Sequence, residues 1–264
     1  MPRLVLCMSS QVAYGPVGNT AAVPALQAAG FTVMQVPTII LSNHPGLAKP
    51  SGVRLPASEI AGILESLETL GVLKECVGVL TGYFAAADQI TAAASFIAKM
   101  KTANPELFVL VDPVLGDGDS LYVSPEVAAA LRDELVPLAT CITPNCFELA
   151  WLTGQKVASL DDARSAAARL SVAEVLATSI PVDDSRLATL AISPDGCSQS
   201  IMARQPNVPH GTGDFLAGLY LGSRLNGFGP PEALKLSTAI LDSAILRSTN
   251  MPCLDIIGAL NSSS

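Results

Sequence analysis

The sequence predicts an α/β fold with a central, mostly parallel sheet that is covered by helices on both faces. Short apolar runs of strand type alternate along the chain with longer segments of helical composition. Right-handed strand–helix–strand crossovers produce this alternation. The composition agrees, because 50% of the 264 residues are hydrophobic and only 14% are charged, which is enough to fill one large core. We therefore expect a single domain over residues 1–264.

The elements follow from the same alternation. Strands are expected over residues 3–8, 31–36, 77–81, 107–111, 140–143, 174–178 and 187–192. Helices are expected over residues 56–70, 86–101, 125–135, 145–153 and 159–170, and over most of the chain from residue 213 onward. Several of these segments begin with the Ser, Thr, Asp or Pro residues that favour a helix start. The proline-rich stretch 37–56 is expected to be an ordered excursion within the domain.

Charge and cysteine usage exclude several classes of protein. Lys and Arg total 15 against 23 for Asp and Glu, so the net charge of −8 offers no general attraction to nucleic acid or to an anionic membrane. Any phosphate must therefore be held by local groups. The six cysteines form no C-x-x-C pair, which predicts reduced thiols and a cytoplasmic location. We expect neither a secretion signal at the start nor a membrane-spanning segment.

The stretch Gly211-Thr212-Gly213-Asp214 leads directly into an apolar helical segment. At a helix start the first backbone N–H groups lack intrahelical partners, and glycines let a phosphate approach them closely. A carboxylate at this place either caps the helix or takes a proton from a hydroxyl that is being phosphorylated. Taken alone, the stretch leaves both interpretations open.

Polar residues also follow the expected strands, at the edge of the sheet where ligands of parallel sheets bind. They are Ser9 to Gln11, Thr81 to Tyr83, Asp112 to Asp117, Thr143 to Glu148, and Thr178 with Ser179. Each has an ordinary structural explanation: Asp112-Pro113 can simply end a strand and begin a turn, and Asn145 can cap a helix. Their shared edge favours a common site, and acids among hydroxyls suit Mg²⁺ with a polyphosphate.

Segments in one consistent order resemble the pyridoxal kinases of the ribokinase-like superfamily, and the resemblance spans almost the whole chain. They are Ser10–Asn19, Leu41–His44, Thr81–Tyr83, Asp112–Asp117, Tyr122–Val123, Thr143–Glu148 and Gly211–Asp214. The resemblance implies a three-layer α/β/α fold and transfer of the γ-phosphoryl group of ATP to the 5′-hydroxymethyl group of pyridoxal. Pyridoxine and pyridoxamine are further candidate substrates. A divalent cation such as Mg²⁺, often a monovalent cation such as K⁺, and a homodimer are also implied.

Residue roles carried over from the family are expectations of the same kind. Asp214 is the expected general base, and Gly211, Thr212 and Gly213 supply the expected anion hole. The vitamin is expected to contact Ser10, Val17, His44, Tyr83 and Asp214. Asp112 and Glu148 are the expected metal ligands. The nucleotide is expected near Asp112, Asp117, Tyr122, Asn145, Glu148, Thr178, Ser179, His210 and the turn 211–213.

The sequence departs from the family pattern on the vitamin side, at Gln11, Pro45 and Lys49-Pro50. These departures concern the preference among vitamers more than phosphoryl transfer. The nearest alternative is a hydroxymethylpyrimidine kinase, whose turn usually ends in cysteine where this chain has Asp214. A sugar kinase is disfavoured because Ser9–Asn19 lacks the glycine-rich start of that group. A non-catalytic vitamin-binding protein would not require the acid at Asp214.

Overall fold

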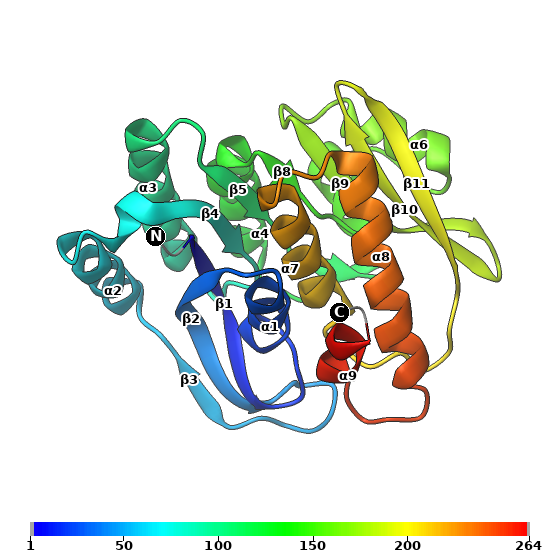
Figure 1. Ribbon diagram of the computed structural model, residues 1–264, viewed down its shortest axis with the longest axis horizontal. Helices are drawn as coiled ribbons and strands as arrows, with labels where there is room; N and C mark the ends of the chain where they lie inside the picture. Colours follow the sequence, from blue (N-terminus) through cyan, green and yellow to red (C-terminus); the bar gives the residue numbers. More distant parts are fainter. Residues whose placement is uncertain (1–2, 263–264) are drawn as a thin grey trace.

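The computed structural model describes residues 3–262, and within them one nine-stranded sheet forms the centre of the molecule (Figure 1). The strand order is β11-β10-β9-β8-β5-β4-β1-β2-β3. Strands from β2 to β9 in this order pair in parallel, whereas β3, β10 and β11 join antiparallel. The expected mostly parallel α/β sheet is confirmed.

The strands alternate with helices in chain order. The strands are β1 (Leu4–Tyr14), β2 (Thr32–Asn43), β3 (Gly52–Arg54), β4 (Cys76–Thr81), β5 (Phe108–Val111), β6 (Gly116–Asp117), β7 (Ser120–Leu121), β8 (Cys141–Ile142), β9 (Glu174–Asp183), β10 (Arg186–Ser193) and β11 (Gly196–Ala203). The α-helices are α1 (Asn19–Ala28), α2 (Ala57–Thr69), α3 (Ala87–Ala103), α4 (Pro125–Ala130), α5 (Cys146–Thr153), α6 (Leu160–Ala167), α7 (Thr212–Leu225), α8 (Pro230–Arg247) and α9 (Ile256–Asn261).

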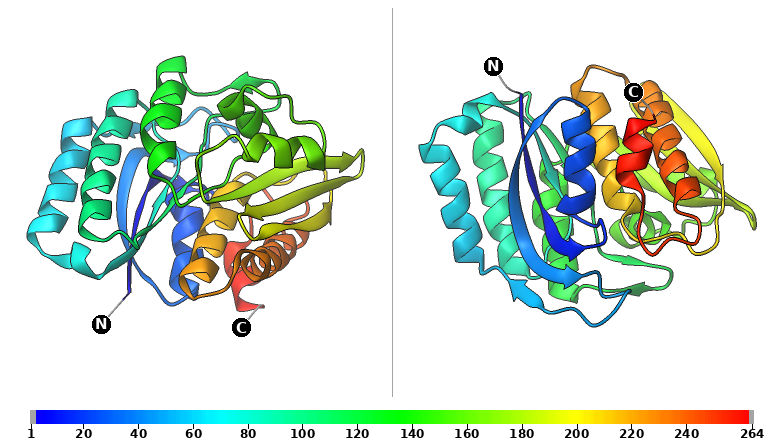
Figure 2. Two further views of the ribbon diagram at one scale, coloured as in Figure 1. Left: turned by 90° about the horizontal axis from the view of Figure 1, so that it is seen from above. Right: turned by 60° about the horizontal axis from the view of Figure 1, so that its bottom comes forward.

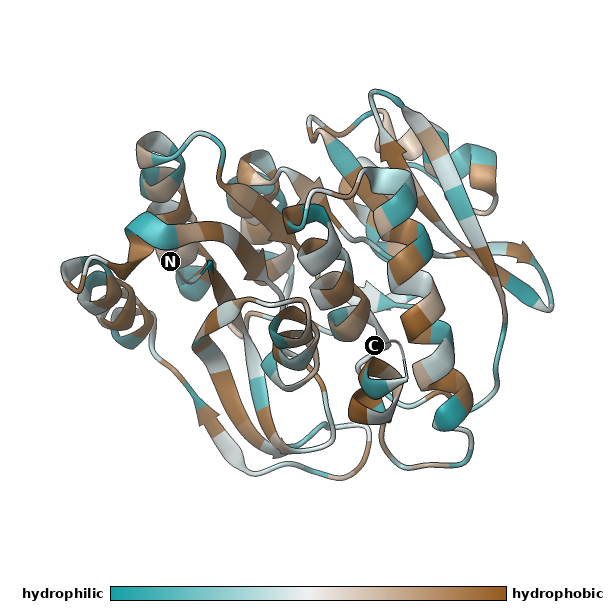
Figure 3. Cartoon of the chain, viewed as in Figure 1, coloured by the Kyte–Doolittle hydropathy of each residue, from teal (hydrophilic) through white to brown (hydrophobic). Residues whose placement is uncertain are grey.

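Two hydrophobic clusters, one on each face of the sheet, give the three layers. In β1, Val5 and Cys7 pack into one cluster while Leu6 and Met8 pack into the other, as the period of two in a strand requires. Helices α2 to α6 cover the face of Leu6, and α1, α7, α8 and α9 cover the face of Val5 (Figure 2). Figure 3 shows the central strands as the most hydrophobic part of the chain. The α/β/α layering is confirmed.

Several elements differ from the expected ones, among them the short strands β3, β6 and β7. Helix α1 was not expected, because Pro24 stands inside it and a proline removes one helical hydrogen bond. Edge strand β11 alternates between exposed and half-buried residues, so its sequence carries no apolar run. The expected helix 125–135 changes after Ala130 into a π-turn over Leu131–Leu135. The stretch 37–56 is ordered as expected, and comprises the end of β2, a loop and β3.

The cysteines are unpaired, as expected, and the one tryptophan packs against the core. All six cysteines are unpaired, and Cys7, Cys76 and Cys141 are buried. Trp151 is half-buried against the core on α5, with the Arg132 guanidinium 5.4 Å from its ring centroid. Between residues 3 and 262, the structure contains no helix with the length and apolar character needed to cross a membrane.

Candidate active site

A cavity of about 910 Å³ lies where the parallel strands end. Its lining residues come from the ends of the strands, from the start of α7, from α8 and from loops between these elements. Figure 1 shows where these elements lie. Every residue proposed for the site from the sequence lines it: Ser10, Val17, His44, Tyr83, Asp112, Asp117, Tyr122, Asn145, Glu148, Thr178, Ser179, His210, Gly211, Thr212, Gly213 and Asp214. The structure thus brings these residues together, and their individual roles stay predictions.

The glycine turn forms the start of α7. Gly211 is the N-cap residue with φ 101°, and a Cβ there would overlap the carbonyl oxygen of Pro16, so only glycine fits. No side chain caps this end of α7. Asp214 lies in the first turn of α7 and is not its N-cap residue. The helix start presents unpaired N–H groups to the cavity, as an anion site requires.

The Asp214 carboxylate instead faces a second helix start. The N–H of Gly18, the N-cap of α1, and the N–H of Asp214 itself lie near enough to the carboxylate to lower its pKa. Gly18 has φ 57°, and a Cβ there would overlap both Ser10 Oγ and the Ser10 carbonyl. On the other side, a Cβ at Gly82 would lie 3.9 Å from Asp214 Oδ1. Sequence reasoning missed the role of Gly18, because the helix that Gly18 precedes was not expected either.

These surroundings tune the acid. Burial raises the pKa of Asp214 to about 6, while the N–H groups of Gly18 and of Asp214 itself lower it. A carboxylate with a pKa just below neutral is ionised at pH 7 and takes a proton more readily than one in water. The geometry and the pKa together suit a general base.

Two further acids lie deep in the cavity. Asp112 follows β5 and is 7% exposed, and its Oδ1 accepts a hydrogen bond of 2.8 Å from the Thr143 hydroxyl. Glu148 on α5 is 4% exposed. Its Oε1 accepts from the N–H of Leu115 at 3.0 Å, and its Oε2 accepts from the N–H of Asn145 at 2.8 Å.

Asn145 and Glu148 therefore also serve as a reciprocal cap for α5, because Glu148 N–H donates to Asn145 Oδ1 at 2.9 Å. The capping explanation for Asn145 holds, and it is compatible with a place in the site. Asn145 Nδ2 donates to the Gly116 carbonyl at 2.8 Å, which ties the β6–β7 hairpin to the cavity wall.

The acids repel one another. Burial, followed by the charge of Asp214, raises the pKa of Asp112 to about 7, although the hydrogen bond from Thr143 lowers it. Burial, followed by the charge of Asp112, raises the pKa of Glu148 well above its ordinary value, although three backbone N–H groups oppose the shift. Among the described residues that line the cavity, Arg204 is the one Lys or Arg. A bound cation would relieve this repulsion.

Local irregularities of the sheet aim side chains at both ends of the cavity. In β9, Thr178 and Ser179 stand opposite the single residue Thr189 of β10, and Ser179 has φ 55°, a left-handed conformation rare outside glycine. In the pairing of β1 with β2, two residues of β2 stand opposite Ser10. Bulges of this kind redirect side chains next to active sites.

The end of the cavity near β1 and β2 is built differently. The N–H of Tyr83 donates to Ser9 Oγ at 3.1 Å, and the Thr38 hydroxyl donates to the Tyr83 carbonyl at 2.6 Å. Burial raises the pKa of the Tyr83 phenol. Pro45 and Pro50 also line this end of the cavity. The result is a largely apolar pocket with hydroxyl groups at Ser10 and Tyr83.

An apolar wall at the opposite end was missed by sequence reasoning. It consists of side chains of β10, β11 and α8: Leu187, Met202, Leu241 and Ile245. The turn signal Pro194-Asp195-Gly196 between β10 and β11 would have indicated the hairpin that carries two of them.

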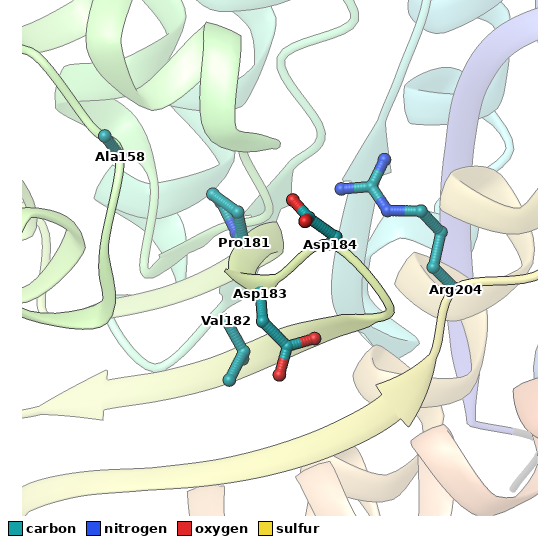
Figure 4. Close-up of a pocket in the computed structure, with 6 residues that line it drawn as sticks. All are labelled: Ala158, Pro181, Val182, Asp183, Asp184 and Arg204. Atoms are coloured by element: carbon teal, nitrogen blue, oxygen red, sulfur yellow. The ribbon is translucent and has the colours of Figure 1, made fainter.

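A second hollow, of about 440 Å³, lies beside the turn between β9 and β10 (Figure 4). Asp183 in this hollow already accepts hydrogen bonds from Arg186 at 2.8 Å and from the Ser185 hydroxyl at 2.8 Å. Arg204, which was not among the residues proposed from the sequence, lines both cavities, and none of the proposed residues lines this hollow. We therefore build the chemistry on the larger cavity.

Comparison with known proteins agrees with this site. A family model described as phosphomethylpyrimidine kinase matches residues 18–255. Pyridoxal kinase PdxY of Deinococcus radiodurans is 38% identical over 257 residues, which cover 91% of this chain and 85% of that protein. Pyridoxal kinase from Entamoeba histolytica has a TM-score of 0.94 at 26% identity and covers 100% of this chain and 96% of its own.

A second solved structure is pyridoxal kinase from Leishmania donovani in complex with ADP and pyridoxine. Its TM-score is 0.92 at 27% identity, with 99% of this chain and 95% of that chain covered. The fold, the glycine turn and the acid at its end define a small-molecule kinase of the ribokinase-like class. The chain belongs to the phosphomethylpyrimidine kinase family and, within it, is related to the pyridoxal kinases.

Proposed function

We propose that this protein transfers the γ-phosphoryl group of ATP to the 5′-hydroxymethyl group of pyridoxal, with pyridoxine and pyridoxamine as further substrates. The observation that carries the proposal is the position of Asp214. Its carboxylate lies at the start of α7, beside the uncapped glycine turn, in a cavity that also contains Ser10 and Tyr83. The named relatives and the ADP–pyridoxine complex support the same reaction.

In the proposed reaction, Asp214 accepts the proton of the vitamin hydroxyl as its oxygen attacks the γ-phosphorus. The new O–P bond forms while the bond between that phosphorus and the leaving oxygen of ADP breaks. The N–H groups of Gly211, Thr212 and Gly213 face the charge on the transferred group. Such a base contributes about 10² to 10⁴ in rate, and a preorganised donor about 10² to 10³.

We also propose that a divalent cation such as Mg²⁺ is held by Asp112 and Glu148, together with phosphate oxygens. The residues fit the ion, because both carboxylates are buried and both pKa values are raised, first by burial and then by the charge of Asp214 on Asp112 and of Asp112 on Glu148. Among the described residues, no group of three or more acidic, His or Cys side chains is arranged to hold a metal alone. Mg²⁺ typically binds through one or two carboxylates, waters and substrate phosphates. When bound, the ion supplies charge neutralisation at the phosphates.

We propose roles for the other residues around the nucleotide as well. Asn145, Thr178 and Ser179 border the phosphates and a monovalent cation such as K⁺, while Asp117 and Tyr122 flank the phosphates from the side of the β6–β7 hairpin.

We infer one kinase domain over residues 1–264. A cytoplasmic location is supported by six unpaired cysteines. A homodimer is supported by exposed apolar side chains near edge strand β3, with Val53 58% and Ile40 41% exposed.

The test is a phosphorylation assay of the purified protein with ATP against pyridoxal, pyridoxine, pyridoxamine and hydroxymethylpyrimidine. We expect phosphorylation of pyridoxal, and loss of activity on adding a metal chelator with recovery on adding Mg²⁺. Full activity in chelator would contradict the cation role of Asp112 and Glu148. No turnover of any B6 vitamer would contradict the proposed function.

The second candidate is a hydroxymethylpyrimidine kinase, which the description of the matching family favours. Pyrimidine turnover exceeding pyridoxal turnover in the same assay would establish it. A non-catalytic vitamin-binding protein would bind pyridoxal and yield no product.

A further inference from the structure

The two histidines of the chain lie against each other, although they are far apart in the sequence. The ring centroids of His44 and His210 are 4.0 Å apart, with an angle of 33° between the ring planes. His44 follows the end of β2, and His210 directly precedes Gly211 of the glycine turn. The contact therefore joins the loop on the vitamin side of the cavity to the turn on the phosphate side.

The loop after β2 is built to accept His210. The His44 ring is held from within its own loop, since the N–H of Gly46 donates to His44 Nδ1 at 3.1 Å. The side chain of Asn43 donates to the carbonyls of His44 at 3.0 Å and Ala48 at 2.9 Å, which closes the loop. A Cβ on Gly46 would overlap His210 Nε2, so a larger residue would displace the second ring.

The His44 ring is suited to this contact in its neutral form. Burial, followed by the charge of His210, lowers the pKa of His44. At neutral pH the His44 ring is therefore uncharged, and two flat rings at this spacing attract one another.

We infer that His210 is a positioning residue for the vitamin: its ring holds His44 and the loop 44–48 over the pyridine pocket, in place of the nucleotide contact expected from the sequence. The inference rests on the proposed function. It predicts that His210 acts on vitamin affinity through His44. A nucleotide-contacting residue would act on ATP affinity without His44.

The first measurement is steady-state kinetics with pyridoxal and ATP. We expect His210→Ala to raise KM for pyridoxal about threefold to tenfold, the effect of losing one aromatic pair, with a smaller change in KM for ATP and in kcat. His210→Phe keeps a flat ring in the same place and should restore most of the KM for pyridoxal. Ser51→Ala, at an exposed residue farther along the same loop, is the matched control.

The second measurement is a double-mutant cycle. Because His210 acts through His44, the double variant H44A/H210A should have the same KM for pyridoxal as H44A alone. Additive effects of the two changes would overturn the inference, as would a rise confined to KM for ATP. Equal thermal unfolding midpoints of H210A and wild type exclude a folding defect. If H210A is destabilised, KM for pyridoxal of H210F is compared with that of wild type, and a near-wild-type value supports the inference.

The inference and the proposed function fail in different ways. If the wild-type protein does not phosphorylate pyridoxal, the proposed function is wrong. If the wild type does and KM for pyridoxal is unchanged in H210A, the inference alone is wrong.

Discussion

The two ends of the cavity are built on opposite principles. At the phosphate end, Asp112 and Glu148 are almost fully buried, and backbone N–H groups or buried hydroxyls fix their oxygens. At the vitamin end, buried residues such as Ser10 and Val17 are joined by a loop whose side chains are more open, with Leu47 41% exposed and His44 half-buried. The first end is part of the core, whereas part of the second is a surface loop.

This difference indicates how the protein separates chemistry from selectivity. Groups that meet developing charge must be held rigidly, because a misplaced donor or base loses most of its effect. A surface loop can change its residues without disturbing the core, so it is the part in which a preference among vitamers can vary. The departures from the family pattern at Pro45 and Lys49-Pro50 fall in this loop. Substitutions at the phosphate end should therefore lower kcat, whereas those at the vitamin end should raise KM.

The largest expected effect is that of Asp214→Asn. The amide keeps the size of the side chain but cannot accept the hydroxyl proton at neutral pH, so kcat should fall about 10² to 10⁴-fold. Binding of ADP and pyridoxal, measured by calorimetry, should stay close to wild type. Glu126→Gln replaces an exposed acid on α4 and serves as the control. A kcat close to wild type in D214N would remove Asp214 from the mechanism.

An intermediate effect is expected from pH. The pKa of Asp214 is raised to about 6 by burial, so below pH 6 the carboxyl group is protonated and cannot act as a base. At saturating Mg²⁺, kcat/KM for pyridoxal should be level above pH 7 and fall about tenfold for each unit below pH 6. A profile that stays level down to pH 5 would contradict the assignment of Asp214 as a base with a raised pKa.

The fold was predictable where apolar patterns are strong. The strands that carry the site are continuous apolar runs because both faces of a parallel sheet are buried. Helix α1 could not be predicted from local rules, because Pro24 argues against it and only packing against α7 and the sheet compensates. Edge strand β11 lacks the pattern because half of it faces solvent.

The site was predictable as a set of residues but not as a geometry. Motifs at strand ends indicated which side chains gather, since topology brings those ends to one edge. The approach of the Gly18 N–H to the Asp214 carboxylate and the ring contact of His44 with His210 join residues distant in the chain. Both depend on tertiary packing, which local sequence does not encode. The bulge at Ser179 likewise arises from the pairing of β9 with β10.

The smallest effect is expected at the vitamin end, from Tyr83→Phe. The change removes one hydroxyl from the cavity wall and leaves the backbone contacts of Tyr83 to Ser9 and Thr38 in place. The loss of one hydrogen bond to the vitamin should raise KM for pyridoxal about twofold to tenfold, with kcat nearly constant. Tyr14→Phe, at an exposed residue of β1, is the matched control. A large loss of kcat in Y83F would mean that the two ends of the cavity share the work of phosphoryl transfer, because a residue remote from the glycine turn would then be stabilising the transition state rather than holding the vitamin.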